Sequence, residues 1–426
     1  MKRLLPLILL ALFSSCSHPP PVERAAKIEE HRGIAYFLSF RDYDPQKVER
    51  ELRRIASLGA NWVSLDVALW QARFDSPEVA LPMAKRYEHP VLKTVYRPDL
   101  WHHFPTDEEI EHFLNTAHGL GLKVMFKPHV HPEYTGMRVV RRGRGADPMW
   151  PGRVHMKDER DWRRWFESYG RVIEYYVGSF PFDAVCVGDE LSGTYGRSRE
   201  WRELISRVKA VRDIPVTCAF NWWVVVHHQK RFLVTLLRLF NLEDEVLRLM
   251  ISKSGYKLEF DPGVLGQLAS DTFAEYPDWT DALDWVGLNF YFPLSDKRDP
   301  SLQELREAWH RYRIPALIGE VEVSYVEGIR SWRDSIGKPL LFTEGGWGKW
   351  DYAAKYPGNW FVERRSNPEL QARCYRAFFE EVYPLGIGAY FWDWAEPGFS
   401  PEGGPAEEVI REFWGKRRSE VETNGG

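Results

Sequence analysis

The sequence predicts one (β/α)8 barrel with a helical insertion after its fifth strand. Apolar runs of strand length alternate with amphipathic segments, which is the pattern of βα units around a parallel sheet. Eight such runs occur, the strand number of this barrel, and 426 residues suit one barrel with insertions. The runs cover residues 33–40, 62–68, 122–128, 182–188, 215–221, 283–291, 339–343 and 387–392.

The segments between the runs show helical periodicity. Val48, Leu52 and Ile55 fall on one face after the first run. Thr106 and Glu109 have the spacing of a capping box, which predicts a helix start before the third run. An open doubly wound sheet would give the same alternation, but the sequence has no glycine-rich phosphate loop after the first run. The barrel is therefore the favoured fold, and it spans residues 33–426.

One stretch, residues 224–278, is longer than a minimal βα unit needs. It leaves from the C-terminal end of the fifth strand, the face on which barrel active sites lie. We expect a helical excursion over the mouth of the barrel. Packing material, or a surface that meets a membrane or a partner, are the alternatives.

The N-terminus has the pattern of an export signal. Lys2 and Arg3 precede an apolar stretch at residues 4–13, and two serines precede Cys16. The apolar stretch is too short to span a bilayer as a helix. We predict a signal peptide at residues 1–15, which would place the protein in a bacterial cell envelope. A cleaved signal with an incidental cysteine is the alternative.

Cys16 stands where the lipobox of bacterial lipoproteins has its acylated cysteine. The predicted lipidated terminus and linker cover residues 16–32 and contain three consecutive prolines, which makes a stiff spacer. The protein would then be anchored at the outer membrane or cell surface. The other cysteines lack metal-like spacing and are expected to be small buried side chains; they are Cys186, Cys218 and Cys374.

Composition narrows the class of partner. Hydrophobic residues make up 44% of the chain and charged residues 28%, which is typical of a globular protein. The net charge is -4 and the basic residues are scattered, so no nucleic-acid surface is indicated. Trp and Tyr number 19 each, and their flat rings suit the apolar faces of sugars. Packing between helices and barrel accounts for most of these rings.

Two glutamates follow apolar runs closely. Glu190 lies two residues beyond the fourth run, after Asp189, and Glu344 directly follows the seventh. Strand ends of a barrel meet on one face, and glycoside hydrolysis needs two carboxyl groups beside the scissile bond. Glu190 and Glu344 are therefore the predicted catalytic pair.

Several segments resemble glycoside hydrolase family 113, a clan A family of retaining β-mannanases on an eight-stranded barrel. They include residues 59–65, 121–130, 188–191, 283–294 and 339–346. The resemblance implies that Glu190 is the general acid/base, that Glu344 is the nucleophile, that β-1,4-mannan-type linkages are cleaved, and that no cofactor takes part.

The chain departs from the family pattern in three places, one of which is the insertion after Trp222, longer than the family core needs. His131 replaces an expected acidic residue, and Asp189 stands where many clan A enzymes have an asparagine that binds the sugar 2-hydroxyl. These departures keep another β-glycan open as the substrate.

Further residues are expected to bind substrate. Lys127 and His129 share one side of the third strand, although a buried, hydrogen-bonded His129 fits equally well. Tyr291 would orient the nucleophile. The full predicted set is Trp70, Gln71, Lys127, His129, Asn221, Trp222, Tyr291, Trp347, Trp392 and Trp394, with the last two as a platform beneath the sugar or as barrel filling.

Two other functions are compatible with parts of the sequence. A metal-dependent hydrolase could draw ligands from His129, His131, His227, His228 and Asp393. Metal barrels normally take ligands from several strand ends, and the His227 and His228 pair lies beyond its strand, so no metal is predicted. A surface lipoprotein that binds glycan without cleaving it is the second. The expected partners are an oligo- or polysaccharide and, through Cys16, a membrane.

Overall fold

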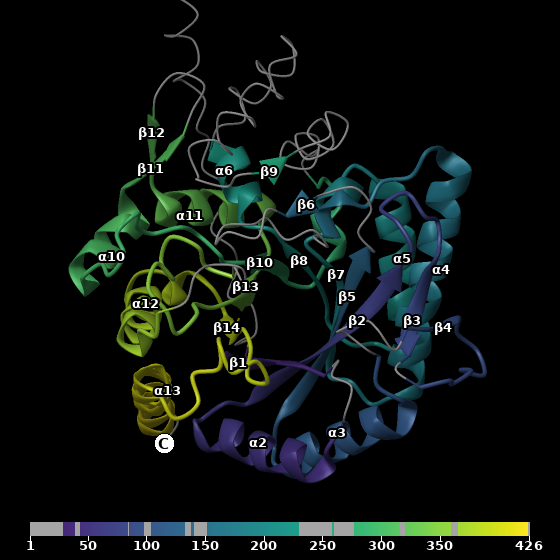
Figure 1. Cartoon of the computed structure of the whole chain (residues 1–426), viewed down its shortest axis with the longest axis horizontal. Coiled ribbons are helices and arrows are strands. Elements are labelled where there is room, and N and C mark those ends of the chain that lie inside the picture. The colour runs from purple at the N-terminus through teal and green to yellow at the C-terminus, as the bar shows by residue number, and fades with distance from the viewer. Residues whose placement is uncertain are drawn as a thin grey trace, which may run out of the picture. The chain divides into compact units, whose positions relative to one another are not determined.

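Eight parallel strands close into a barrel in the computed structural model (Figure 1), which confirms the predicted fold class. The model describes residues 29–38, 43–83, 85–97, 104–132, 138–139, 151–229, 258–259, 277–315, 320–358 and 365–424. The predicted signal peptide and Cys16 lie outside these residues. Within them, no helix has the length and apolar character that crossing a membrane requires.

The barrel closes because β1 pairs in parallel with both β2 and β14. Each intermediate strand pairs in parallel with its two neighbours. The eight strands are β1 (His31–Phe37), β2 (Trp62–Gln71), β5 (Lys123–Pro132), β7 (Ala184–Asp189), β8 (Val216–Phe220), β10 (Val286–Asn289), β13 (Leu340–Gly345) and β14 (Gly388–Phe391).

Helices surround these strands (Figure 1). Their apolar faces are buried, and the predicted capping box of Thr106 and Glu109 is present. The helices are α2 (Pro45–Ser57), α3 (Asp107–Gly119), α4 (Glu159–Ser179), α5 (Ser198–Val211), α6 (Trp223–Gln229), α10 (Leu302–His310), α11 (Tyr325–Ile336), α12 (Pro368–Glu381) and α13 (Pro405–Asn424).

Short strands extend the βα connections. β3 (Val79–Met83) pairs antiparallel with the end of β2 and parallel with β4 (Thr94–Tyr96). β11 (Tyr312–Pro315) and β12 (Glu320–Val323) form an antiparallel hairpin.

The insertion begins as α6, which packs against α11. Residues 230–257 and 260–276 of the insertion lie outside the described part. Between them, β9 (Leu258–Glu259) pairs antiparallel with β6 (Arg138–Val139), a segment of the connection after β5. Because that connection leaves the C-terminal end of β5, this pairing agrees with an insertion at the mouth of the barrel.

The barrel interior changes character along its axis. Trp62, Met125, Cys186, Leu341 and Tyr390 belong to one buried apolar cluster of inward-facing side chains. Side chains alternate along a strand, so the residues two and four positions later also face inward. These positions lie near the C-terminal ends of the strands. On β2 and β5 these positions carry Asp66, Lys127 and His129. Asp189 and Glu344 lie three residues beyond Cys186 and Leu341, where the strand pairings of β7 and β13 shift register.

Candidate active site

Three charged side chains meet inside the barrel from β2 and β5. Asp66 and Lys127 are register partners, and His129 lies two residues beyond Lys127 on the same face. Lys127 Nζ lies 3.4 Å from Asp66 Oδ2, and His129 Nε2 lies 3.1 Å from that oxygen. The predicted placement of Lys127 and His129 on one side of the strand is confirmed. All three are buried, so each charge needs a partner within the cluster.

Asp189, the last residue of β7, supplies a second carboxylate. Its Oδ1 lies 3.2 Å from Lys127 Nζ and its Oδ2 lies 3.1 Å from His129 Nδ1. Burial lowers the pKa of His129, and the Lys127 charge also lowers it. The charge of Asp189 and the hydrogen bonds to Asp189 and Asp66 together raise this pKa to about 10. His129 is thus a charged side chain with a carboxylate at each ring nitrogen. This arrangement fits the alternative of a buried, satisfied histidine.

Glu344 lies on β13 and is buried beside this cluster. Its Oε2 accepts a hydrogen bond from Lys127 Nζ, and its Oε1 accepts one of 2.6 Å from the Tyr291 hydroxyl. The pKa of Glu344 is raised on balance: burial raises it, as do the charges of Asp189 and Asp66, while the Lys127 and His129 cations oppose the rise. Burial and the neighbouring Glu344 raise the pKa of Tyr291 well above its ordinary value, so Tyr291 stays a donor. The geometry is that of a carboxylate oriented by a tyrosine, as predicted.

Glu190 follows β7 with a left-handed backbone, at φ 49°. Such a conformation costs a non-glycine residue about 1–3 kcal/mol and persists where the surroundings fix it, often at functional sites. Here the Glu190 N–H donates to the Ala219 carbonyl at 2.9 Å, and the Ser192 N–H donates to the Glu190 carbonyl at 2.8 Å. These bonds fix the turn that presents the Glu190 side chain.

The Glu190 carboxyl has a different environment from Glu344. Asn289 Nδ2 donates to Glu190 Oε1 at 3.1 Å, and the Asn221 side chain also bonds this group. Burial first, and then the charges of Asp189 and Glu344, raise the pKa of Glu190 to about 7. Lys127 contacts Glu344, whereas amides contact Glu190. The site therefore favours the anion on Glu344 and the proton on Glu190.

The charged cluster also bears on the metal alternative. Ligand atoms of Asp66, His129 and Glu344 lie within 4.8 Å of one another, a spacing that a metal ion can use. Lys127 Nζ, however, contacts both carboxylates. Burial lowers the pKa of Lys127, but the charges of Asp189, Asp66 and Glu344 together raise it well above its ordinary value. An ammonium ion already supplies the positive charge there. This set of ligand atoms therefore does not fit a metal cation in addition to the ammonium group.

His131, His228 and Asp393, also named in that alternative, have other surroundings, and the His227 side chain lies outside the described part of the structure. His131 lies with its ring 6.2 Å from that of His129, and His228 Nε2 is hydrogen-bonded to Ser331. Asp393 Oδ1 accepts hydrogen bonds from the backbone N–H groups of Phe37 and Ala395. The Asp393 contact with Phe37 ties the end of the barrel to β1, and the His228 contact lies between α6 and α11.

Two predicted substrate-binding residues, Gln71 and Trp347, lie in the core. Gln71 is buried, and its amide donates to the Ser76 carbonyl at 2.8 Å and accepts from the Trp165 indole. Trp347 is fully buried against Phe290 and Tyr375. These residues therefore offer no face to a sugar.

Trp394 fits the alternative of barrel filling that the sequence leaves open for Trp392 and Trp394. It is 2% exposed, whereas Trp392 contacts the site through Phe37, His129 and the Lys127 ammonium. The two were expected to share a strand face, but β14 ends at Phe391, so the alternation does not reach them. Trp392 alone of the pair lies at the cluster.

The other predicted aromatic residues remain at the barrel rim or near Glu190. Trp70, at the end of β2, is partly exposed and has the Arg97 guanidinium over its ring. Trp222 is partly exposed and stacks on Trp223 with ring centroids 4.2 Å apart. Asn221, between β8 and Trp222, bonds Glu190 as described above.

The sequence analysis did not select Asp66, Asn289 or Thr343 as site residues. Each is a polar residue inside an otherwise apolar strand, and a buried polar residue is an informative signal. The predicted cysteines behave as expected, since Cys186, Cys218 and Cys374 are buried.

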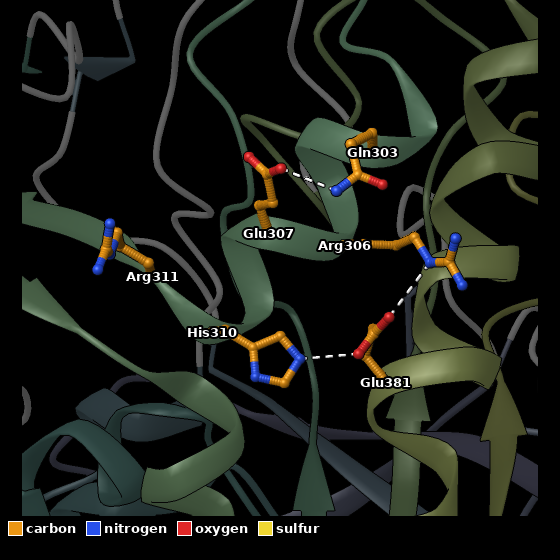
Figure 2. A pocket seen from close by; sticks show the side chains of 6 residues that line it. All are labelled: Gln303, Arg306, Glu307, His310, Arg311 and Glu381. Carbon is orange, nitrogen blue, oxygen red and sulfur yellow. Dashed lines mark hydrogen bonds and ion pairs between the residues drawn. The ribbon is translucent and has the colours of Figure 1, made fainter.

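A separate cavity of about 480 Å³ lies among helices outside the barrel (Figure 2). It is lined by α10 and by Glu381 of α12. His310 and Arg306 both bond Glu381, at 2.7 and 3.2 Å, and Gln303 bonds Glu307. It contains none of the predicted site residues.

Comparisons with known proteins agree with the barrel. The model of Glycoside Hydrolase Family 113 matches residues 35–235. The family 113 β-mannanase AaManA from Alicyclobacillus acidocaldarius, solved with ManMIm, is 20% identical; the alignment covers 92% of this chain and 98% of that chain, with a TM-score of 0.61. A family 113 β-1,4-mannanase in a complex structure is 19% identical, with 92% and 100% covered and a TM-score of 0.60. No curated protein matches this sequence.

Proposed function

We propose that this chain is a glycoside hydrolase of family 113, whose model matches residues 35–235, and that it cleaves β-mannosidic linkages with retention of anomeric configuration. Glu190 acts as acid/base and Glu344 as nucleophile. The observation that carries the proposal is the contrast between these carboxyls. Lys127 and Tyr291 stabilise the Glu344 anion, while the pKa of Glu190 rises to about 7 through burial and negative neighbours.

The proposed reaction has two steps. Glu344 attacks the anomeric carbon while Glu190 gives its proton to the glycosidic oxygen, so the glycosidic bond breaks and a glycosyl ester forms on Glu344. Glu190, now an anion, then takes a proton from water, which attacks the anomeric carbon and releases Glu344. Inversion occurs twice, so the product keeps its configuration. Mannan-type substrates are supported by the β-mannanases that share the fold.

Product analysis tests the proposal. Proton NMR during hydrolysis of β-1,4-manno-oligosaccharides, beside gluco- and xylo-oligosaccharides, should show the β-anomer as the first product from the manno series. Hydrolysis of another series instead would replace mannan as the substrate class. First appearance of the α-anomer would contradict the retaining mechanism, and turnover of none would support a glycan-binding protein.

Two variants test the assigned roles. Glu344→Ala removes the nucleophile and should abolish turnover, with azide restoring some activity by attack from the vacated side. Glu190→Ala should lower the rate on natural glycans by about 10²–10⁴-fold and spare aryl mannosides with good leaving groups, which need little protonation. Full activity in Glu344→Ala would overturn the assignment.

A further inference from the structure

Asn289 joins the two proposed catalytic strands through a single buried amide. Its side chain lies at the end of β10 and is 0% exposed. Nδ2 donates to Glu190 Oε1 at 3.1 Å and to Asp189 Oδ1 at 3.0 Å. Both amide hydrogens are therefore used. One binds the carboxyl of Asp189 at the end of β7, and the other binds the carboxyl of Glu190, the next residue.

The direction of this amide is fixed from the nucleophile's strand. Thr343, which precedes Glu344, donates its hydroxyl hydrogen to Asn289 Oδ1 at 2.9 Å. With Oδ1 held by Thr343, Nδ2 must face Asp189 and Glu190. The backbone adds a second link, because the Phe290 N–H donates to the Glu344 carbonyl at 2.8 Å.

We propose that Asn289 is a positioning residue for the proton donor: its amide, oriented by Thr343, holds the Glu190 carboxyl in one orientation relative to Glu344. The inference rests on the proposed function for its kinetic consequences and on geometry for the contact itself. A carboxyl with one oxygen held by an N–H presents the other oxygen to the glycosidic oxygen. Free rotation of that carboxyl would place the proton incorrectly in part of the population.

Other charged or titratable groups face Glu190 and must be considered in any pH experiment. Asp189 and Glu344 act on its charge directly. Tyr291 and Tyr195 are coupled to it, and both have raised pKa values that keep them neutral over the working range. Lys127 and His129 contact Asp189, and they affect the Glu190 carboxyl through the charge of Asp189. A change at Asn289 also removes the amide hydrogen bond to Asp189, but the Lys127 and His129 contacts to the Asp189 carboxylate remain.

The kinetic test compares Asn289→Ala with the wild type. The lost hydrogen bond no longer stabilises the Glu190 anion, so the pKa of Glu190 and the alkaline limb of kcat/KM should move to higher pH. On manno-oligosaccharides kcat should fall by about 10²-fold, the lower end of the rate enhancement that general acid catalysis supplies. On an activated aryl mannoside kcat should fall by less than about tenfold. KM should stay near the wild-type value.

Two controls separate positioning from general damage. Thr343→Val should shift the limb in the same direction, and Thr343→Ser, which keeps a hydroxyl, should restore it. Gln371 offers a matched buried amide with two backbone acceptors, the carbonyls of Trp347 and Phe399, and lies outside the charged cluster. Gln371→Ala should lower stability without moving the limb. An unmoved limb in Asn289→Ala, with equal loss on both substrates, would overturn the proposal.

A measurement without turnover distinguishes this inference from the proposed function. Carbon-13 NMR of protein labelled at glutamate carboxyls gives the Glu190 titration, assigned by its absence in Glu190→Gln. A higher pKa in Asn289→Ala supports the contact even if no glycan is hydrolysed. An unchanged titration in a folded variant overturns the inference even if the wild type is an active mannanase.

Discussion

Lys127 brings its ammonium group into contact with three carboxylates, those of Asp66, Asp189 and Glu344. Its side chain is 0% exposed. Removing one member of a buried ion cluster leaves unpaired charge, which costs about 3–5 kcal/mol. We therefore expect Lys127→Met to lower the free energy of unfolding by about that amount, as measured by urea denaturation.

A surface lysine gives the control for this experiment. Lys47 pairs with Glu51 at 3.7 Å, and its side chain is 53% exposed. Exposed pairs contribute about 0–1 kcal/mol, so Lys47→Met should change stability by less than about 1 kcal/mol. Equal effects at the two positions would contradict the interpretation of the buried cluster.

Glu190 should link both activity and stability to pH, and both should fall as its carboxyl ionises. Its pKa is about 7 in the folded protein, against an ordinary value of 4.5. The folded state thus binds this proton more tightly, so the stability associated with the protonated form is complete below pH 4.5 and is lost as pH rises through about 7. The acid form that the reaction needs disappears over the upper part of this range.

Glu190→Gln tests this linkage because glutamine stays neutral. We expect its melting temperature to exceed that of the wild type at pH 8 and to match it near pH 4. The wild-type rate should show a bell-shaped pH profile with an alkaline limb near 7. Identical melting curves at pH 8 would show that the Glu190 carboxyl is not destabilised by ionisation.

At the scale of elements, β10 depends on a glycine for its close approach to the neighbouring strands. A Cβ at Gly287 would lie 2.5 Å from the Cys218 carbonyl oxygen on β8 and 2.7 Å from Thr343 Cγ2 on β13. Backbone atoms of a barrel strand cannot move aside easily. Gly287→Ala should therefore destabilise the protein by about 1–3 kcal/mol in urea denaturation.

The same element carries Asn289 and precedes Tyr291, so displacement of β10 should also reduce activity. Gly119 in α3 is the matched control, since a Cβ there meets no atom within 4 Å. Gly119→Ala should be neutral, or stabilise by up to about 1 kcal/mol through the lower entropy of the unfolded chain. A neutral Gly287→Ala would mean that the strands can separate to admit a methyl group.

For the whole molecule, we propose a lipid anchor that holds the barrel at a membrane of the cell envelope. The proposal rests on the sequence around Cys16, with its preceding apolar stretch and following prolines. Cys16→Ser should abolish incorporation of labelled fatty acid and release the protein into the soluble fraction. Detergent-free release of the wild type would count against the anchor.

The sequence by itself predicted the barrel, its eight strands and the positions of Glu190 and Glu344 at two strand ends. These features are local in origin, because apolar runs, helix periodicity and capping residues act over a few neighbouring residues. The capping box at Thr106 and the buried apolar face of α2 show this directly. Polar residues within apolar strands, such as Asp66 and Asn289, also carried a signal that could have been used.

The tertiary structure decided which side chains meet and which remain in the core. Lys127 and Glu344 are 217 residues apart in sequence and in contact in space, while Trp347 and Trp394, equally aromatic in sequence, are buried. Register and strand ends determine such outcomes, as with the end of β14 at Phe391, and they depend on closure of the whole barrel. The charge state of the site follows from the same closure, because burial and mutual distance, which the linear sequence does not specify, set the pKa of each group.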